Sequence, residues 1–471
     1  MAEPELRDEA VDAAAEIPVH DDAGWLTDAF IAAVHAAVEA ADRDEVRRLA
    51  GDMHEADMAD LVDALPASDR AAFVQLMGDL FDYAALTEMD EAVRVRLLED
   101  LPTADIAEGL GELDSDDAVY ILEDLDEEDQ AAILDELPLS ERVQLERALD
   151  YPEESAGRRM QTDFIAVPPF WTVGQAIDYL REDKDLPDTF YELYVVDPGF
   201  RLVGSVALDR ILRTQRAEKI ASIMEEDPHS VPVKEDQEEV ARLFERYNLV
   251  STAVVDDSNR LVGVLTVDDI VDVIQEEADE DMKALAGVGD EEISDSVLTI
   301  ARSRIVWLLF NLGTGLLSAT VISQFEGTIE AMVALAVLMP IVASLGGNAG
   351  TQTMTIAVRA IATEELDTRN IWRVLRREVM VSFLNGSLLA CLIGATAGLW
   401  FFNHGLGIVI ASAIIINMFC AGLAGLMIPM TLHRFKVDPA IASSVFVTMV
   451  TDVIGFFAFL GIAALWFRLP M

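Results

Sequence analysis

The sequence has few of the residues that form covalent cross-links or soft-metal sites. Only two of its 471 residues are cysteine, Cys391 and Cys420, and both lie in apolar stretches. A disulfide framework and a cysteine-based metal site are therefore excluded. The chain shows no nucleophile–base pair, P-loop or metalloprotease motif, so we do not expect an enzyme. Its first residues, MAEPELRDEAVDAAAE, lack the basic and apolar regions of a signal peptide, and we expect the N-terminal half to stay in the cytoplasm.

Basic residues are also scarce, and their distribution divides the chain. Only five lysines occur, and residues 1–300 hold 77 of the 85 Asp and Glu but 23 of the 33 Lys and Arg. Residues 301–471 are nearly neutral, with 8 acids and 10 bases. A surface so negative attracts cations and repels nucleic acid, so no nucleic-acid partner is expected. We interpret most of the acidity as a halophile-like surface within which a smaller set of acids binds divalent cations.

Residues 25–150 carry a twelve-residue repeat. Its copies begin at an early leucine, Leu65, and then at Leu101, Leu113, Leu125 and Leu137. An Asp, Ser or Thr suited to a helix N-cap follows each leucine, and apolar residues then recur at helical spacing. One short helix per repeat predicts a helical solenoid, preceded by a disordered acidic tail over 1–24. A spacer role and a binding role both remain open for this solenoid.

Residues 151–275 contain a longer duplication. The segment LYVVDPGFRLVGSVALDRIL (193–212) matches AVVDDSNRLVGVLTVDDIVDVI (253–274), and an amphipathic helix precedes each. Each copy is typical of a strand, turn, strand and helix in an α/β unit. The pair resembles tandem cystathionine-β-synthase (CBS) domains, which usually dimerise and often bind adenine nucleotides. The resemblance implies a ribose contact from Thr266 and Asp269 in the second copy, whereas the first copy lacks both residue types.

Five apolar segments follow residue 304. They cover 305–323, 331–358, 379–401, 407–431 and 439–467. Each is long enough to cross a hydrocarbon core of ~30 Å, which takes about 20 helical residues. A polar helix over 276–303 is expected to connect them to the CBS copies. Arg and Lys cluster at alternate ends of the segments, which predicts a multi-pass protein of the cytoplasmic (inner) membrane with its N-terminus inside and its C-terminus outside.

An acid within the last apolar segment marks a candidate functional site. Asp452 lies near the middle of FVTMVTDVIGFF, and no Arg or Lys occurs at that depth. A charge at the centre of a membrane helix costs about 2.5–3.5 kcal/mol on insertion scales, so an unpaired one usually serves a function. We therefore interpret Asp452 as a pore-facing carboxylate that attracts a cation.

The second apolar segment contains PIVASLGGNAGTQT (340–353). Pro340 interrupts the helical hydrogen-bond ladder, and two glycines, Gly346 and Gly347, permit close backbone approach. Asn348 and Gln352 add two amides on one helix face. Interrupted backbone at membrane depth is tolerated where it lines a wet cavity or packs in protein. Beside a mid-membrane carboxylate, this segment reads as a pore wall for a hard divalent cation, because soft metals prefer thiol or imidazole ligands.

The order of these parts resembles the MgtE family of magnesium channels and transporters. The resemblance covers about residues 25–468, and its specific motifs are SAGRRM (155–160), PIVASLGGNAGTQT (340–353), VDPA (437–440) and VTDVIGFF (450–457). The family implies an all-α solenoid N-domain, an α/β CBS pair, a connecting (plug) helix and a five-helix transmembrane bundle over 304–471. It further implies a homodimer with a central Mg²⁺ pore that closes when cytoplasmic Mg²⁺ binds the acidic domains, and possible ATP binding at the CBS pair.

The resemblance also implies which residues form the sites. The pore residues would be Asp452, Thr448, Gly455, Asn348, Gly347 and Ser444. The acids at the outer mouth would be Glu326 and Glu330. The acids that bind regulatory Mg²⁺ would be Glu238, Asp269, Asp272, Glu277, Glu280 and Asp281. The sequence departs from the family at Ser444, where relatives place Asn or Gly, and at Arg159, where an apolar residue is usual.

Two other functions stay open at this point. One is an ion-coupled transporter, or one of broader selectivity that carries Co²⁺ or Mn²⁺. The other is a membrane-anchored CBS protein that senses nucleotides without transport. The intramembrane acid and the glycine-rich second segment favour transport over the nucleotide sensor, but the sequence does not separate a channel from a carrier.

Overall fold

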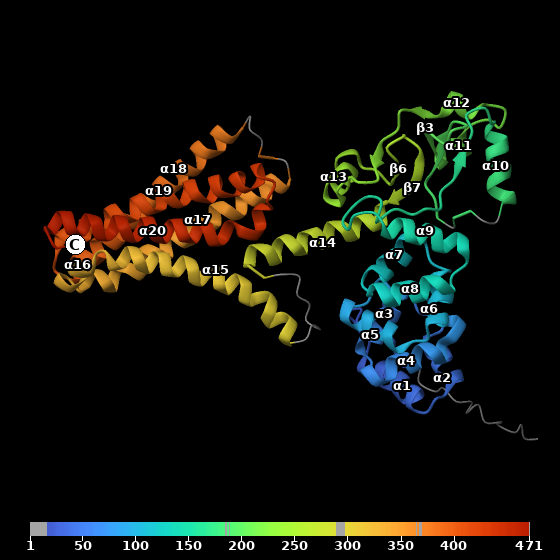
Figure 1. The fold of residues 1–471 in the computed structure, drawn as a ribbon, viewed down its shortest axis with the longest axis horizontal. Coiled ribbons are helices and arrows are strands. Elements are labelled where there is room, and N and C mark those ends of the chain that lie inside the picture. The colour runs from blue at the N-terminus through green and yellow to red at the C-terminus, as the bar shows by residue number, and fades with distance from the viewer. Residues whose placement is uncertain are drawn as a thin grey trace, which may run out of the picture. The chain divides into compact units, whose positions relative to one another are not determined.

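The computed structural model describes residues 17–183, 186–187, 189–288, 297–363, 365–366 and 370–470 (Figure 1). The chain forms two compact units, residues 1–274 and 275–471, and each is described by itself. The predicted disordered tail lies outside the described residues up to residue 16. From residue 17 onward the chain contacts the N-domain, where His20 Nε2 lies 3.0 Å from Asp57 Oδ1.

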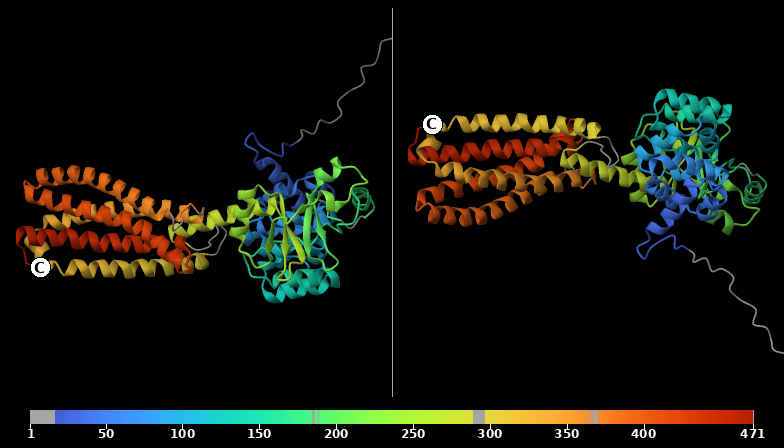
Figure 2. Two further views of the ribbon diagram at one scale, coloured as in Figure 1. Left: turned by 90° about the horizontal axis from the view of Figure 1, so that it is seen from above. Right: turned by 90° about the horizontal axis from the view of Figure 1, so that it is seen from below.

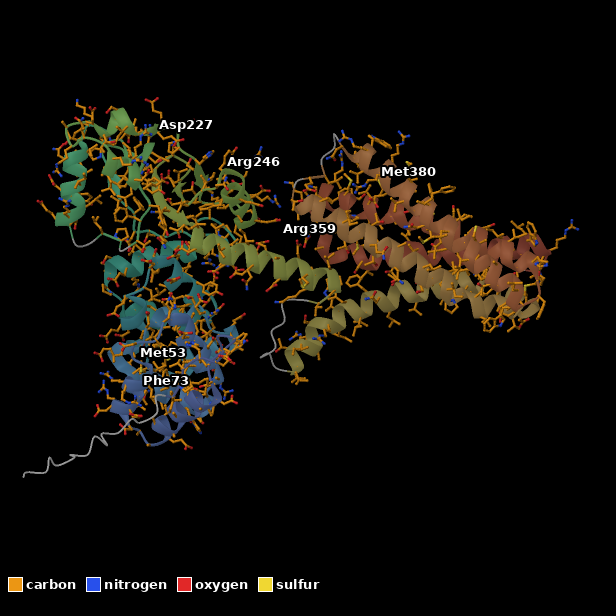
Figure 3. All side chains as sticks on the ribbon, turned by 180° about the vertical axis from the view of Figure 1, so that it is seen from behind. Met53, Phe73, Asp227, Arg246, Arg359 and Met380 are labelled. Carbon is orange, nitrogen blue, oxygen red and sulfur yellow. The ribbon has the colours of Figure 1, made fainter. Side chains whose placement is uncertain are left out.

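Short helices build the N-terminal domain of the first unit, which is blue to teal in Figure 1. In chain order they are α1 (Asp28–Glu39), α2 (Arg43–Ala50), α3 (Glu55–Ala64), α4 (Ala67–Met77), the 3-10 turns η1 (Gly78–Leu80) and η2 (Tyr83–Leu86), α5 (Glu91–Asp100), α6 (Thr103–Leu110), α7 (Ser115–Glu123), α8 (Glu127–Glu136) and α9 (Leu139–Leu149). Their apolar faces meet in one core that includes Phe73, which Figure 3 labels beside Met53. The predicted helical solenoid is confirmed.

The twelve-residue repeat fixes where the helices begin. Helices α6, α7, α8 and α9 each start two residues after a leading leucine of the repeat. The capping chemistry is less uniform than the sequence predicts. Asp126 caps α8 by accepting hydrogen bonds from the amides of Glu128 and Asp129, whereas Pro102 and Pro138 stand at the N-caps of α6 and α9, where no side chain caps. Proline suits the start of a helix because its fixed φ is already close to helical and its missing N–H is not needed there.

Two small sheets form the rest of the first unit. The elements are β1 (Ala166–Val167), α10 (Val173–Glu182), β2 (Glu192–Val196), β3 (Leu202–Ala207), α11 (Leu208–Arg213), α12 (Ile220–Ile223), β4 (Glu225–Glu226), β5 (Ser230–Pro232), α13 (Gln237–Tyr247), β6 (Ser251–Val255) and β7 (Leu261–Thr266). The strand orders are β1-β2-β3-β4 and β5-β6-β7. In both sheets a parallel pair precedes an antiparallel hairpin, and both hairpins shift register at the same point. The predicted duplication is confirmed.

Helix α14 (Val267–Ala286) follows β7 and spans the boundary between the two units. The sequence predicts a helix over 276–303 that runs into the first apolar segment, and the structure ends it earlier. Gly287 adopts a φ of +73°, and the amides of Gly287 and Val288 bond to the carbonyls of Ala284 and Lys283. This left-handed cap stops the helix. The predicted link over 289–296 lies outside the described residues, and the next helix begins at Val297.

The second unit contains long apolar helices. They are α15 (Val297–Ser323), α17 (Ala334–Ala362), α18 (Ile371–Trp400), α19 (His404–Arg434) and α20 (Pro439–Phe467), with a short α16 (Glu326–Ala331) that the sequence did not predict. Five are long and apolar enough to cross a membrane. Figure 2 shows them running alongside one another. The most buried apolar window belongs to α19, at 56%, and the least buried to α15, at 6%.

Helix α17 is continuous, so the predicted break at Pro340 is wrong. The helix runs for 29 residues with Pro340 inside it. Proline removes only one donor from the ladder, and neighbouring helices in a bundle tolerate that loss. The glycines of α17 permit close packing instead. A Cβ on Gly346 would lie 2.1 Å from Asn417 Nδ2 of α19, and one on Gly350 would lie 2.5 Å from a methyl carbon of Val447 on α20.

The two ends of the bundle differ in charge. At one end the hydroxyl of Thr328 on α16 donates a hydrogen bond of 2.6 Å to the carbonyl of Pro470, which ties α16 to the C-terminus. Arg359, at the C-terminal end of α17, lies at the opposite end of the bundle (Figure 3). Arg373, Arg376 and Arg377 stand in the first turns of α18, the next long helix along the chain after Arg359.

Candidate ion site and acidic cluster

Helix α20 places three of the predicted pore residues on one face. Ser444, Thr448 and Asp452 follow at intervals of four, a spacing that aligns side chains along a helix. Thr448 is exposed, and Ser444 and Asp452 are half-buried. The Thr448 hydroxyl donates to the Ser444 carbonyl at 2.9 Å, which leaves the acceptor side of the hydroxyl oxygen free to face a cation or its water. Gly455 is buried instead, against Asn417 of α19.

The carboxylate of Asp452 has no ionic partner among the described residues. It is half-buried on the apolar helix α20. Taking a carboxylate out of water without a partner is unfavourable by several kcal/mol. A cation that approaches along α20 would remove this penalty, so the geometry fits an ion-attracting site.

The predicted pore residues of α17 lie on an open face. No atom of a neighbouring residue lies within 4 Å of where a Cβ on Gly347 would be. Asn348 is exposed, and its amide donates only a long hydrogen bond of 3.4 Å to Ser344 Oγ. The outer-mouth candidates Glu326 and Glu330 are both exposed on α16. A single chain therefore presents open polar faces on α17 and α20 without closing a ring around an ion.

Three aspartates meet in the first unit where the N-domain contacts the second CBS copy. Asp116 and Asp117 lie in the first turn of α7, and Asp269 lies in the first turn of α14. Asp116 is 6% exposed, and its carboxyl group lies against that of Asp269. Burial, and next the charge of Asp269, raises the pKa of Asp116 well above its ordinary value. Burial also raises the pKa of Asp117 to about 7 and that of Asp269 to about 6.

Polar contacts hold the two domains together around these acids. The hydroxyl of Ser115 accepts a hydrogen bond of 2.7 Å from the Thr162 amide. Glu123, at the end of α7, lies 3.3 Å from Arg158 and 3.6 Å from Arg159, both in the segment that leads into the CBS pair. Arg159, which departs from the family pattern, thus serves this contact. The contacts force like charges together, so a proton or a cation would stabilise the docked arrangement.

The predicted regulatory acids are only partly brought together. Glu238 is paired with Arg242 at 2.5 Å, and burial together with Asp268 raises the pKa of Asp272. The remaining three, Glu277, Glu280 and Asp281, belong to the second unit. Over the described ranges, no group of three or more His, Cys, Asp or Glu side chains is arranged to hold a metal. Of the predicted set, only Asp269 joins the buried cluster.

Of the two predicted nucleotide residues, Thr266 lines a small cleft and Asp269 does not. The hydroxyl of Thr266 donates a 2.5 Å hydrogen bond to Asp269, so the two side chains engage each other. The adjacent cleft holds only about 20 Å³, far below the range of about 300–1,000 Å³ typical of ligand sites. Its described lining includes Asp163 and Glu192 and contains no Lys, Arg or His. A triphosphate would meet negative charge at this cleft, which is too small to hold a nucleotide in the conformation described.

Comparison with known proteins settles the family. Family models match the MgtE intracellular N domain over residues 53–154, the CBS domain over 156–216 and 220–276, and the MgtE divalent cation transporter over 339–462. The magnesium transporter MgtE of Bacillus subtilis is 36% identical over 316 residues, which cover 67% of this chain and 70% of the relative. The chain belongs to the MgtE family.

Further relatives agree with this assignment. The MgtE magnesium transporter of Thermus thermophilus is 35% identical over 329 residues, covering 68% of this chain and 72% of the relative. Two solved structures match as well, the soluble part of a magnesium transporter and the cytosolic domain of the Mg²⁺ channel MgtE in complex with ATP. They are 29% and 30% identical, cover 53% and 52% of this chain and 98% and 99% of the solved chains, and have TM-scores of 0.47 and 0.48.

Two features of this MgtE chain escaped the sequence reasoning. Asp116 and Asp117 were hidden among the many acids, although the pair stands at the start of a repeat helix whose first turn is buried. Asn417 was passed over in the apolar run of α19, where it is 1% exposed. A lone amide in the centre of a membrane helix was the available signal, because such groups seek partners on neighbouring helices.

Proposed function

We propose that this MgtE protein is a Mg²⁺-selective ion channel of the cytoplasmic membrane that closes when cytoplasmic Mg²⁺ binds its acidic domains. The observation that carries the proposal is Asp452, a half-buried and unpaired carboxylate on the apolar helix α20. The matching relatives are magnesium transporters, which supports Mg²⁺ as the ion. The protein works as a homodimer in the bilayer, with its N-terminus inside and its C-terminus outside.

Selection rests on holding a hydrated ion. Mg²⁺ sheds its waters reluctantly and usually keeps several of them when a protein binds it. Two copies of Asp452 provide two negative charges, while Thr448 and Asn348 provide oxygens that accept hydrogen bonds from the water shell. Because one chain leaves the faces of Gly347 and Thr448 open, a second copy is needed to complete the ring.

Closure is transmitted by helix α14. Its first turn carries Asp269, which faces Asp116 in the first unit. Near its other end Ala284 is buried in a cluster with Met354 of α17 and Val447 of α20. Mg²⁺ at the aspartates favours the docked arrangement, and α14 then holds α17 and α20 in the closed state. Gating is a population shift whose size is set by the difference in Mg²⁺ affinity between the two states.

The same site favours Mg²⁺ over two alternatives. A carrier of Co²⁺ would gain from imidazole ligands, and α20 carries none near Asp452, whereas Mn²⁺ takes the same oxygen ligands as Mg²⁺ and is separated from it only by the flux competition below. If the protein were a nucleotide sensor without transport activity, the intramembrane Asp452 would have no role. ATP is bound by the solved cytosolic domain of a related Mg²⁺ channel, and its binding at the CBS pair here is part of the proposal, although the gating steps above do not require it.

Ion flux into liposomes tests the proposal. We expect the purified protein to carry Mg²⁺ down its gradient without a coupled ion, and Co²⁺ and Mn²⁺ to compete weakly. Asp452→Asn should abolish flux while leaving a folded dimer, because the neutral amide cannot attract the hydrated ion. Asp438→Asn on the same helix is the control, since Asn preserves the N-cap bond to Ala440. Normal Mg²⁺ flux in Asp452→Asn would exclude Asp452 from the pore.

A further inference from the structure

Asn417 occupies a slot between two glycines at the junction of three membrane helices. Its side chain on α19 is 1% exposed. A Cβ on Gly346 of α17 would lie 2.1 Å from its Nδ2, and a Cβ on Gly455 of α20 would lie 2.7 Å from the same atom. Both helices therefore need glycine at these positions to admit the amide, and the amide touches both pore-facing helices at once.

The hydrogen bonds of Asn417 fix which way its amide points. Nδ2 donates a buried hydrogen bond of 2.9 Å to the carbonyl of Val342 on α17. The reverse orientation would set two acceptors against each other, so only the NH₂ group can face Val342. The other amide atom, Oδ1, is buried and has no hydrogen-bond partner among the described residues. An unsatisfied buried acceptor costs about 1–3 kcal/mol, so its retention calls for an explanation.

The position of the slot explains why the unsatisfied acceptor is retained. Gly455 lies three residues after Asp452, so the two share a face of α20 and are separated by less than one turn. Gly346 lies one turn before Gly350 on α17. Both glycines lie on the face of α17 that packs against α19 and α20. Asn417 thus links the backbone of α17 to the part of α20 that carries the carboxylate.

We propose that Asn417 is a positioning residue of the pore, which holds α17 against α20 through Val342 and Gly455 and so sets where Asp452 presents its charge. This inference rests on the proposed transport function. The amide acts through the helices and does not contact the ion. The amide fits between the helices only while both glycines stay in contact with it. A shift of α20 is therefore resisted by the packing of Gly455 against the amide and by the hydrogen bond that holds the amide to Val342 of α17.

A double substitution separates positioning from simple packing. Asn417→Ala removes the amide and leaves the slot empty, whereas Gly346→Ala alone drives a methyl group into Nδ2. The pair Gly346→Ala with Asn417→Ala refills the slot without restoring the hydrogen bond. Asn417→Leu keeps roughly the shape of the side chain but loses the donor. Each variant is assayed as full-length protein in liposomes for Mg²⁺ flux and for inhibition of that flux by Ca²⁺ and Co²⁺.

Positioning and packing predict different results. If Asn417 positions Asp452, the double variant recovers a stable dimer, yet the ratio of Mg²⁺ to competing-ion binding stays shifted by about three- to thirtyfold, the range expected for one interhelical hydrogen bond. Asn417→Leu should show the same shift. Recovery of normal selectivity in the double variant, or normal selectivity in Asn417→Leu, would refute positioning.

A matched control lies on the other side of α19. Ser382 of α18 fills an equivalent slot at Gly422, where a Cβ would lie 2.2 Å from its hydroxyl oxygen, but this contact faces away from α20. Ser382→Ala should leave selectivity unchanged, and an equal shift there would also refute the inference. Absence of Mg²⁺ flux in the unsubstituted protein would instead refute the proposed function, so the two failures are distinguishable.

Discussion

The buried aspartates at the start of α7 predict that protons and Mg²⁺ compete to hold the N-domain on the CBS pair. The pKa of Asp117 rises from 3.8 to about 7 when the domains are docked, chiefly through burial. The docked state therefore binds protons more tightly than the open state. Its stability is greatest below about pH 4, falls as the pH rises toward 7, and levels off above that pH.

The size of the effect follows from the shift. About three pKa units correspond to roughly 4 kcal/mol, which is an upper limit because neighbouring groups relax around the charge. Asp117→Asn removes the titrating group and should strengthen docking above pH 7 by a large part of this amount. The same substitution should reduce the response of docking to Mg²⁺, because one ligand charge is lost.

Hydrogen exchange of the full-length protein measures this docking directly. After correction for the intrinsic pH dependence of exchange, the amides of α7 should be better protected at pH 5.5 than at pH 8. Added Mg²⁺ should raise protection strongly at pH 8 and weakly at pH 5.5, whereas KCl of equal ionic strength should not. Without Mg²⁺, Asp117→Asn should show a smaller difference between the two pH values, although Asp116 and Asp269 still titrate.

The control is the same change in the neighbouring repeat. Asp105 stands in the first turn of α6 and is exposed, so Asp105→Asn should leave the pH response of α7 intact. Protection of α7 that rises with pH in the unsubstituted protein, or that is unchanged by Asp117→Asn, would refute the competition between protons and Mg²⁺. If KCl protects α7 as well as Mg²⁺ does, the acids do not bind Mg²⁺ specifically and form only a salt-adapted surface.

Three further outcomes are expected. Gly425→Ala should lower the thermal unfolding temperature in detergent, because its Cβ would lie 2.6 Å from a backbone carbonyl oxygen of α17. Overpacking of this kind costs about 1–3 kcal/mol. Gly313→Ala is the control and should leave the unfolding temperature unchanged, since no atom lies within 4 Å of its Cβ. Deletion of residues 1–274 should leave a pore whose liposome flux persists at high internal Mg²⁺; a deletant that still closes would place the sensor elsewhere. Glu123→Ala should increase proteolysis between the N-domain and the CBS domains, because the buried Arg158 guanidinium loses its carboxylate partner at a cost of about 1–3 kcal/mol. Unchanged proteolysis would show that the ion pair between Glu123 and Arg158 does not stabilise the contact.

Much of the fold can be predicted from local patterns of the sequence. The leucines of the twelve-residue repeat predict α6 to α9 because each short helix buries one apolar face and the leucine before it. The duplicated strands predict both CBS sheets because alternation and turn residues are local signals. Helix α14 was predicted less well, since its end depends on the left-handed backbone of Gly287 rather than on its polar run.

The sites were less predictable because they depend on contacts between distant segments. Asp452 stood out, since a charge in an apolar span is conspicuous by itself. Asp116 did not, because its burial arises only when α7 meets α14, and nothing local marks it among 85 acids. The proline of α17 suggested a break, yet a continuous helix results, because partner helices and not local propensity decide the backbone there.

The polarity of α17 also has a consequence for how the protein enters the bilayer. Its most apolar window has a mean hydropathy of 1.4, the lowest of the five spans, whereas that of α19 reaches 2.3. Helix α19 is therefore retained in the lipid by its own composition, but α17 carries Pro340 and two side-chain amides into the same environment and emerges from the ribosome first. We expect α17 to be held weakly at the translocon until α19 follows and its Asn417 reaches Val342. Assembly of the pore would then wait for the fourth span, and chains truncated before it should leave α17 accessible to water.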